Sequence, residues 1–189
     1  QNMVAQGVKG IAITPTSAAV VPALNKARKA GVKIVLMDND IPSWKGKTAV
    51  VATDNLKGGV LAGKFLATKL KAGDTLGVLE GVPGVPALDA RVTGMLAGLG
   101  ALKSKIKVVS KPETDCDQTK GATAAQTILT ANQNLTAIYS ACGPPALGAI
   151  QSIKNAGIKP GGILLVGFDA SPDEVKAIRA GTETASVAQ

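Results

Sequence analysis

Two short apolar runs, each leading to an aspartate, constrain the fold of this chain more than any other feature. Lys33–Met37 (K-I-V-L-M) runs directly into Asp38, and Ile163–Val166 (I-L-L-V) is followed three residues later by Asp169. Such runs are too short for helices of their own and suit strands buried on both faces, as in a parallel sheet. An acid at the carboxyl end of such a strand lies where open α/β sheets bind ligands.

The approach to each aspartate is also repeated along the chain. A-G-V-K at 30–33 parallels A-G-I-K at 156–159, and strand-like runs lie upstream at Val8–Thr14 and Leu135–Ala141. The chain therefore contains two copies of a strand–helix–strand–aspartate pattern. Strand–helix–strand units also resemble one another because each must pack a helix on a parallel sheet. For the helices, this common packing requirement remains an alternative explanation of the repeat.

Helix-start signals separate the remaining strand-like runs. Ser171 and Glu174 around Pro172 form a capping-box pattern, and Asp54 or Asn55 can cap a helix over 55–70. Further strands are expected at 48–53, 75–80, 107–112 and 184–188, and further helices at 18–30, 87–102, 118–131 and 145–156. This regular alternation predicts an α/β fold with a right-handed, doubly wound parallel sheet.

Composition agrees with this class. The 189 residues are 46% hydrophobic but only 2% aromatic, so the core is expected to consist of Val, Ile, Leu and Ala packed between helices and sheet. A chain of this length can form one or two domains. No apolar run is long enough to span a bilayer, and because position 1 is not Met we expect a piece of a longer protein or a processed form.

Charge and missing residue types exclude several functions. The formal net charge is +8, but most cations are lysines scattered singly and aromatic platforms for bases are scarce, so a solvated lysine surface is favoured over nucleic-acid binding. Histidine is absent, which removes Ser-His-Asp chemistry and His-ligated metals. The loop at 81–86 lacks a P-loop signature, and no G-x-G-x-x-G follows a strand. We therefore expect no catalytic residues, no cofactor and no metal.

Taken together and in this order, several segments resemble the periplasmic sugar-binding proteins of the ribose-binding type, the solute receptors of ABC importers. The resemblance covers essentially the whole chain. It is carried by G-V-K-G-I at 7–11, A-G-V-K-I-V at 30–35, T-D-N at 53–55, A-L-G-A-I at 146–150, V-G-F-D at 166–169 with Pro172-Asp173, and the closing Ala188-Gln189.

The resemblance implies two Rossmann-like lobes joined by a hinge, with the ligand enclosed between them. Residues 1–53 would form an incomplete N-terminal lobe, 54–185 the C-terminal lobe, and 186–189 the strand that returns through the hinge. Thr53 and Asp54 would lie at the first hinge crossing. By the same likeness the chain would be a fragment that begins after the first strand–helix unit of the family.

The resemblance also implies a set of ligand-binding residues. Asp38 and Asn39 would contribute from the N-terminal lobe, and Arg91 and Asp169 from the C-terminal lobe. Phe168 would form an apolar wall, and Gln189 would contribute from the return strand. Charge-assisted bonds from such groups suit sugar hydroxyls, which both donate and accept. Capping of α/β turns by the aspartates and an exposed helix charge at Arg91 are the alternatives.

Two cysteines depart from the family pattern. Cys116 occupies a position that often holds a stacking phenylalanine, and Cys142 one that often holds a sugar-contacting asparagine. Both would face the cleft and are expected among the ligand-binding residues. We also expect them to form a disulfide, with two free thiols as the alternative. Their presence leaves the ligand open among ribose, another pentose, a hexose and a polyol.

The expected function is capture of a sugar or polyol by hinge closure and delivery to a membrane ABC permease. No nucleic-acid partner is expected, and the full-length protein should be monomeric. The location would be periplasmic or extracellular, with a cell-surface lipoprotein as one form. Two alternatives are the effector-binding core of a LacI-type transcription repressor and a nucleotide-dependent Rossmann enzyme. Trp44 could border the pocket or cover its lobe.

Overall fold

A computed structural model describes residues 2–189. The chain divides into two compact units: Gln1–Thr53 with Val85–Ala87, and Asp54–Gly84 with Leu88–Gln189. The first break falls between Thr53 and Asp54. The short piece Val85–Ala87 groups with the first unit, although a continuous second lobe over 54–185 was expected. The assignment of 1–53, 54–185 and 186–189 as two lobes and a return strand stays a prediction.

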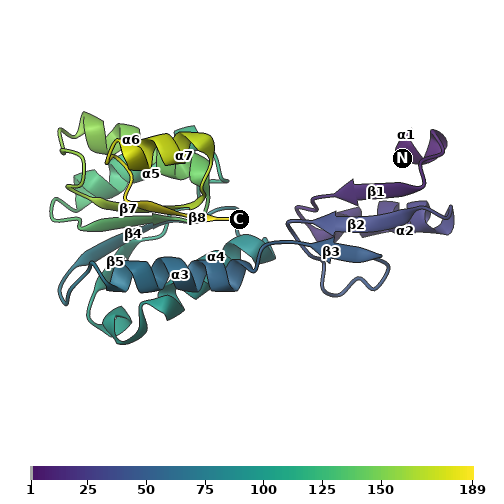
Figure 1. Ribbon diagram of the computed structural model, residues 1–189, viewed down its shortest axis with the longest axis horizontal. Coiled ribbons are helices and arrows are strands. Elements are labelled where there is room, and N and C mark those ends of the chain that lie inside the picture. Colours follow the sequence, from purple (N-terminus) through teal and green to yellow (C-terminus); the bar gives the residue numbers. More distant parts are fainter. Residues whose placement is uncertain (1) are drawn as a thin grey trace. The chain divides into compact units, whose positions relative to one another are not determined.

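The second unit contains a parallel sheet. Within residues 54–189 its five strands follow the order β5-β4-β6-β7-β8 (Figure 1). They are β4 (Thr75–Leu79), β5 (Lys107–Ser110), β6 (Ala137–Ser140), β7 (Leu164–Asp169) and β8 (Ala185–Ala188). Every residue of β4 and β6 is buried, as their apolar sequences require. The strand order changes direction between β4 and β6, and ligands bind at such a switch point in open α/β sheets.

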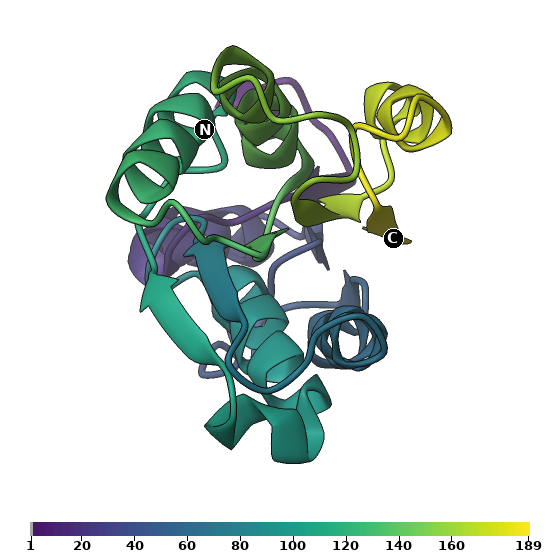
Figure 2. The same ribbon diagram turned by 90° about the vertical axis from the view of Figure 1, so that its left-hand side faces the viewer.

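Helices cover both faces of this sheet, which confirms the doubly wound α/β class (Figure 2). Two lie on one face, α3 (Asn55–Ala67) and α4 (Pro86–Gly98), and three on the other, α5 (Gln118–Ala131), α6 (Gly143–Asn155) and α7 (Pro172–Arg179). One core cluster, which includes Leu66 and Met95, fills the α3–α4 side, and another, which includes Ile128 and Ile153, fills the opposite side. The aliphatic core expected from composition is therefore present on both faces.

Helices α3 and α4 are in contact through their backbones. A Cβ added at Gly59 would collide with the carbonyl oxygen of Arg91, and one added at Gly94 would collide with the carbonyl oxygen of Leu56. Glycine is required at both positions because no side chain fits between the helices. This contact sets the spacing between the start of α3 and the middle of α4.

The first unit has a smaller parallel sheet. Within residues 2–53 its strands follow the order β1-β2-β3, with β1 at Gly10–Ile13, β2 at Lys33–Met37 and β3 at Ala49–Val51. Helix α2 (Val21–Lys29) packs on it after a short 3₁₀ turn, η1 (Ala18–Val20), and α1 (Asn2–Ala5) precedes β1. Trp44 belongs to the core of this unit and donates from Nε1 to Asn25 Oδ1 at 2.8 Å. Trp44 therefore covers its own unit.

Some element ends differ from the sequence expectations. The helix expected over 87–102 ends at Gly98 and is followed by the 3₁₀ turn η2 (Gly100–Ser104), because Gly100 has a φ of +55°. Strand β7 continues to Asp169 beyond the expected end at Val166, since it pairs with β8 along that length. Across residues 2–189, no helix combines the length and the apolar character needed to cross a bilayer.

Candidate functional site

Both strand-end aspartates have an unusual backbone conformation. Asp38 directly follows β2 with a φ of 62°, and Asp169 ends β7 with a φ of 101°. L-residues rarely adopt positive φ, which costs about 1 kcal/mol per residue. The duplicated sequence pattern therefore has a counterpart in the backbone of each unit.

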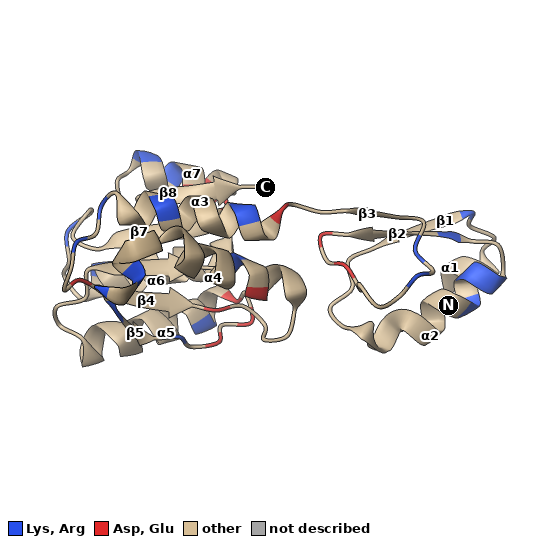
Figure 3. Ribbon diagram, turned by 90° about the horizontal axis from the view of Figure 1, so that it is seen from below, with Lys and Arg blue, Asp and Glu red and all other residues tan. Residues whose placement is uncertain are grey.

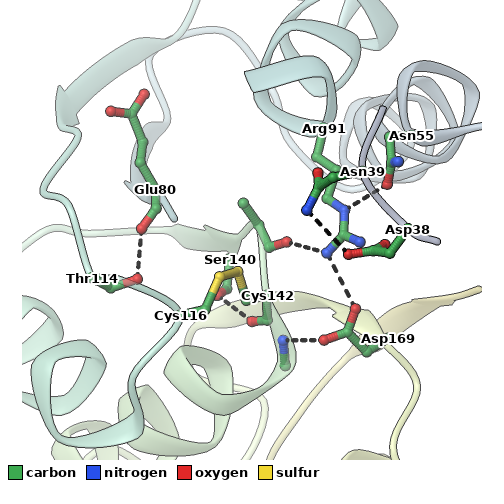
Figure 4. The surroundings of a disulfide bond; sticks show 12 residues. Asp38, Asn39, Asn55, Glu80, Arg91, Thr114, Cys116, Ser140, Cys142 and Asp169 are labelled. Atoms are coloured by element: carbon green, nitrogen blue, oxygen red, sulfur yellow. Dashed lines mark hydrogen bonds and ion pairs between the residues drawn. A yellow bond between two sulfur atoms is a disulfide. The ribbon is translucent and has the colours of Figure 1, made fainter. Parts of the chain in front are cut away.

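Arg91 is the centre of a polar cluster in the second unit (Figure 4). It lies on α4 and is only 3% exposed. Its Nε donates to Asn55 Oδ1 at 2.8 Å, and one terminal nitrogen donates to the Ala141 carbonyl at 2.9 Å and to Asp169 Oδ1 at 3.2 Å. The other terminal nitrogen donates to Gln189 Oε1 at 3.0 Å. The guanidinium therefore joins α3, α4 and the ends of β6, β7 and β8.

Asp169 receives donors on both carboxylate oxygens. Oδ1 accepts from Arg91 and from Gln189 Nε2, the latter at 2.6 Å. Oδ2 accepts from the Gly143 backbone N–H at 3.0 Å, at the first residue of α6. A negative charge is stabilised at a helix N-terminus by the helix dipole and the unpaired amide groups. The carboxylate is thus held in place by three residues outside its own strand: Arg91 of α4, Gly143 of α6 and Gln189 after β8.

Two aromatic side chains support this cluster. The Arg91 guanidinium lies 3.9 Å from the centroid of the Phe168 ring, which is a cation–π contact. Phe168 is fully buried, with Gly58 of α3 close against its ring. The Tyr139 hydroxyl donates to the Arg91 carbonyl at 3.4 Å, and burial raises the pKa of Tyr139 far above its usual range. Its hydroxyl therefore remains protonated at all physiological pH values.

The expected disulfide between Cys116 and Cys142 is confirmed, with a Cα–Cα distance of 5.5 Å. Cys116 precedes α5, and Cys142 is the N-cap of α6. The bond thus ties the starts of two helices together at the carboxyl edge of the sheet. Its Cys116 sulfur faces Gly81, where an added Cβ would lie 3.1 Å away. The assignment of both cysteines as ligand-binding residues stays a prediction.

The remaining expected residues lie in the first unit or at its boundary. Asn39 donates from Nδ2 to Asp38 Oδ2 at 3.4 Å, and the Asp38 N–H donates to the Val51 carbonyl at 2.9 Å. Asp54 caps α3 by accepting from the Lys57 N–H at 3.1 Å, and this bond lowers the pKa of Asp54. Hinge roles for Thr53 and Asp54 stay predictions.

The structure adds residues that the sequence patterns did not identify. Asn55 was expected only as a helix cap, yet its side chain accepts from the Arg91 Nε. Asn55 is the last residue of the T-D-N motif at 53–55, which was one of the segments that carried the family resemblance, but only the packing of α3 on α4 brings it to Arg91. Among the described residues 2–189, no group of three or more His, Cys, Asp or Glu side chains could hold a metal ion.

The fold and this cluster are those of a solute-binding domain. Residues 1–189 match the family described as periplasmic binding protein domain, and the chain belongs to that family. It is 35% identical, over its whole length, to the ribose import binding protein RbsB of Bacillus subtilis (strain 168) and spans 60% of that protein. It is also 35% identical to the D-allose-binding periplasmic protein of Escherichia coli (strain K12), with 96% of this chain and 60% of that protein covered.

A solved structure agrees with these sequence relatives. The periplasmic binding component of the arabinose ABC transporter from Shewanella sp. ANA-3, bound to L-arabinofuranose, superposes with a TM-score of 0.92 at 30% identity. The match covers 100% of this chain and 64% of that one. The ribose-binding resemblance is confirmed. The chain spans about 60% of the length of the curated relatives it matches.

Proposed function

We propose that the protein containing this chain is the solute-binding component of an ABC-type importer, which captures a sugar or polyol between two lobes by hinge closure. The observation that carries this proposal is the Arg91 cluster. A buried guanidinium, a carboxylate and two side-chain amides converge at the ends of β6, β7 and β8. Relatives named for ribose, D-allose and L-arabinofuranose support the same ligand class.

The chemistry of the cluster suits a polyhydroxylated ligand. A sugar hydroxyl both donates and accepts, so it can bond to Asp169 and to Arg91 at once. Gln189 bonds to both of these residues with its own amide. A hydroxyl that replaces the Gln189 contact gains charge-assisted bonds of about 1.5–3 kcal/mol each without leaving a buried charge unpaired.

Closure of the two lobes completes the proposed mechanism. Asp38 and Asn39 bind the ligand from the lobe at 1–53, and Arg91, Phe168 and Asp169 hold it from the lobe at 54–185. Cys116 and Cys142 lie at the edge of the site. Rotation at Thr53, Asp54 and residues 186–189 brings the lobes together, and a ligand that contacts both lobes stabilises the closed state.

The partner and location follow from the same proposal. The closed form docks on a membrane permease, and the protein catalyses no reaction and binds no nucleic acid. The full-length protein is monomeric and lies in the periplasm or outside the cell, free or as a lipoprotein. The disulfide supports an oxidising compartment.

The test is isothermal titration calorimetry and thermal shift of the full-length protein with D-ribose, D-allose, L-arabinose, D-galactose, ribitol and NAD. We expect one of the sugars or the polyol to bind and to raise the melting temperature. Asp169→Asn should lower the affinity for that ligand by about 10- to 100-fold, because charge-assisted bonds to the ligand hydroxyls are lost. Stabilisation by NAD alone, with no response to any sugar or polyol, would overturn the proposal.

Two further variants separate binding from folding. When the ligand replaces its contacts with Arg91 and Asp169, the exposed Gln189 amide can bond to a ligand hydroxyl itself. Gln189→Ala should therefore weaken ligand binding by about 3- to 10-fold, as expected for one neutral hydrogen bond, without unfolding the protein. Asp173→Asn removes the same charge as Asp169→Asn from the same unit. Asp173 is exposed and pairs with Lys176, so this control should bind as the wild type does.

A further inference from the structure

A second pair of carboxylates lies behind the strand-end aspartate. Glu174 of α7 and Glu183, just before β8, are 0% and 2% exposed. A Cβ added at Gly167 of β7 would lie 2.5 Å from Glu183 Oε1 and 2.6 Å from Glu174 Oε1. Both carboxylates therefore occupy the space that a side chain at Gly167 would take, and they lie next to each other.

Glu174 is connected to the backbone of the ligand site. Its Oε1 accepts from Ser186 Oγ at 2.8 Å, and Ser186 Oγ accepts from the Ala170 N–H at 3.0 Å. Its Oε2 accepts from the Ser171 N–H at 2.8 Å, within the capping box of α7. Glu174 thus holds, directly or through Ser186, the two residues that follow Asp169.

The turn that these bonds hold is strained. Asp169 has a φ of 101° and Ala170 a φ of 50°. Two successive positive φ angles in residues other than glycine persist only where the surroundings enforce them. The bonds from Ala170 and Ser171 to Ser186 and Glu174 supply that constraint, and they thereby fix the direction of the Asp169 carboxylate toward Arg91.

Glu183 has no comparable support. Among the described residues, neither of its carboxylate oxygens accepts a hydrogen bond of ordinary geometry, and the Gly167 N–H is a weak partner at most. Burial, together with the neighbouring Glu174 carboxylate, raises the pKa of Glu183 to about 8, although the Gly167 N–H acts in the opposite direction. At neutral pH, the Glu183 carboxyl group is therefore mostly protonated and uncharged.

No cation offsets this pair on the elements around it. Strand β8 has no titratable residue, and β7 has only Asp169, which faces Arg91 and the start of α6. On α7, Asp173 and Lys176 pair with each other at the surface, and Arg179 is exposed. The titratable residue of α6, Lys154, is exposed as well.

We propose that Glu174 and Ser186 are positioning residues for the ligand site, and that loss of the Glu183 proton to solvent loosens their hold on the Asp169–Ala170 turn. This inference rests on the proposed function. Two adjacent buried negative charges repel each other strongly. The repulsion weakens the bonds from Glu174 to Ser186 and Ser171, so Asp169 is no longer held toward Arg91 and ligand affinity falls at alkaline pH.

The first test is calorimetry of the full-length protein, from pH 6 to pH 9, with the sugar or polyol that binds best. Wild-type affinity should be nearly constant up to about pH 7 and fall about three- to tenfold by pH 9, the upper figure being close to the limit for one group with a pKa of about 8. The isosteric Glu183→Gln should keep its affinity over the whole range. Glu113→Gln removes the same charge at an exposed site and should follow the wild type. A flat wild-type profile, or an equal fall in Glu183→Gln, would overturn the inference.

The second test does not depend on a ligand. Hydrogen exchange at the Ala170 and Ser171 amides is compared in wild type and Glu183→Gln at the same pH, so that intrinsic exchange rates cancel. At pH 9 these amides should exchange at least fivefold faster in the wild type, and equally at pH 6. Ser186→Ala should accelerate Ala170 exchange at both pH values, and Ser186→Thr should restore protection. Equal exchange at pH 9 would refute the inference whether or not a sugar binds. Failure of every tested sugar and polyol to bind would refute only the proposed function.

Discussion

At the residue scale, Arg91 provides what another cation could not. Its planar group donates to Asn55, Ala141, Asp169 and Gln189 in different directions, and its face stacks on Phe168. A lysine has one small ammonium group on a flexible chain and cannot reproduce this arrangement. Several of these acceptors are buried, so removing their donor leaves them unsatisfied.

We therefore expect Arg91→Lys to lower the free energy of unfolding by about 2–4 kcal/mol and to weaken the ligand by at least about 100-fold. Urea unfolding and calorimetry measure the two effects. Arg179→Lys, at an exposed position on α7, serves as the control and should change neither quantity. Wild-type affinity in Arg91→Lys would show that the guanidinium geometry is not required.

The sequence identified some of these residues and missed others for a physical reason. Asp169 could be predicted because a buried apolar run and a helix cap bracket it within a few positions. Asn55 and Ala141 could not be assigned to Arg91, since only the packing of α3 on α4 and the order of the strands bring them to the guanidinium. Glu183 is preceded and followed by threonine and is typical of an exposed turn, yet it is buried.

At the element scale, the disulfide links the starts of α5 and α6. Both helices pack on the same face of the sheet, and Cys116 and Cys142 are 26 residues apart. A link of this span restricts the unfolded chain and contributes about 3–4 kcal/mol in the chain-entropy model. The edge of the sheet near the proposed site is thereby fixed by a covalent bond.

The double variant Cys116→Ser with Cys142→Ser should lower the melting temperature by about 10 °C. In a protein of this length, each kcal/mol of lost stability lowers the melting temperature by about 2–4 °C. Differential scanning calorimetry measures the change. Reductant should lower the melting temperature of the wild type to that of the double variant, and it should leave the melting temperature of the double variant unchanged. An equal melting temperature in wild type and double variant would contradict a stabilising role for the bond.

Whether a segment forms a helix or a strand could be predicted from its periodicity, but the end residues of some helices and strands could not. The bounds of β2 and α5 are as expected, because clear caps and apolar runs define them. Helix α4 ends earlier than its apolar pattern, since Gly100 adopts a positive φ that the pattern does not reveal. Strand β7 is longer than its apolar run because pairing with β8, a distant segment, extends it.

At the scale of the whole molecule, charge is unevenly distributed between surface and core. Figure 3 shows lysine and arginine segments spread over both units, which fits the solvated lysine surface expected from sequence. Buried acids are concentrated behind β7, at Glu174 and Glu183. The alternation of strands and helices predicted the layered architecture, but the inward direction of these acids depends on the space left by Gly167.

The stability of the protein should therefore depend on pH through Glu183. Its pKa is raised from 4.5 to about 8 on folding, so the native state binds more protons than the unfolded state between these values. The contribution of Glu183 to the free energy of unfolding is fully present below about pH 4.5 and is lost as the pH rises through 8. After allowance for solvent screening we expect a loss of about 2–4 kcal/mol.

The measurement is urea unfolding of wild type and Glu183→Gln between pH 5 and pH 9. The difference in unfolding free energy between the two proteins should move steadily in favour of Glu183→Gln as pH rises. Glu113→Gln should show no such trend relative to the wild type. A difference that stayed constant with pH would mean that Glu183 is ionised throughout.

The glycine contact between α3 and α4 has a consequence for how any lobe motion proceeds. Because main chain touches main chain there, no change of rotamer can alter the separation of the α3 and α4 backbones that carry Asn55 and Arg91. These two backbone segments must travel as one rigid block. If the proposed sugar site includes Asn55 and Arg91, this fixed backbone spacing limits which sugars fit there, and adaptation to a different ligand has to come from other residues.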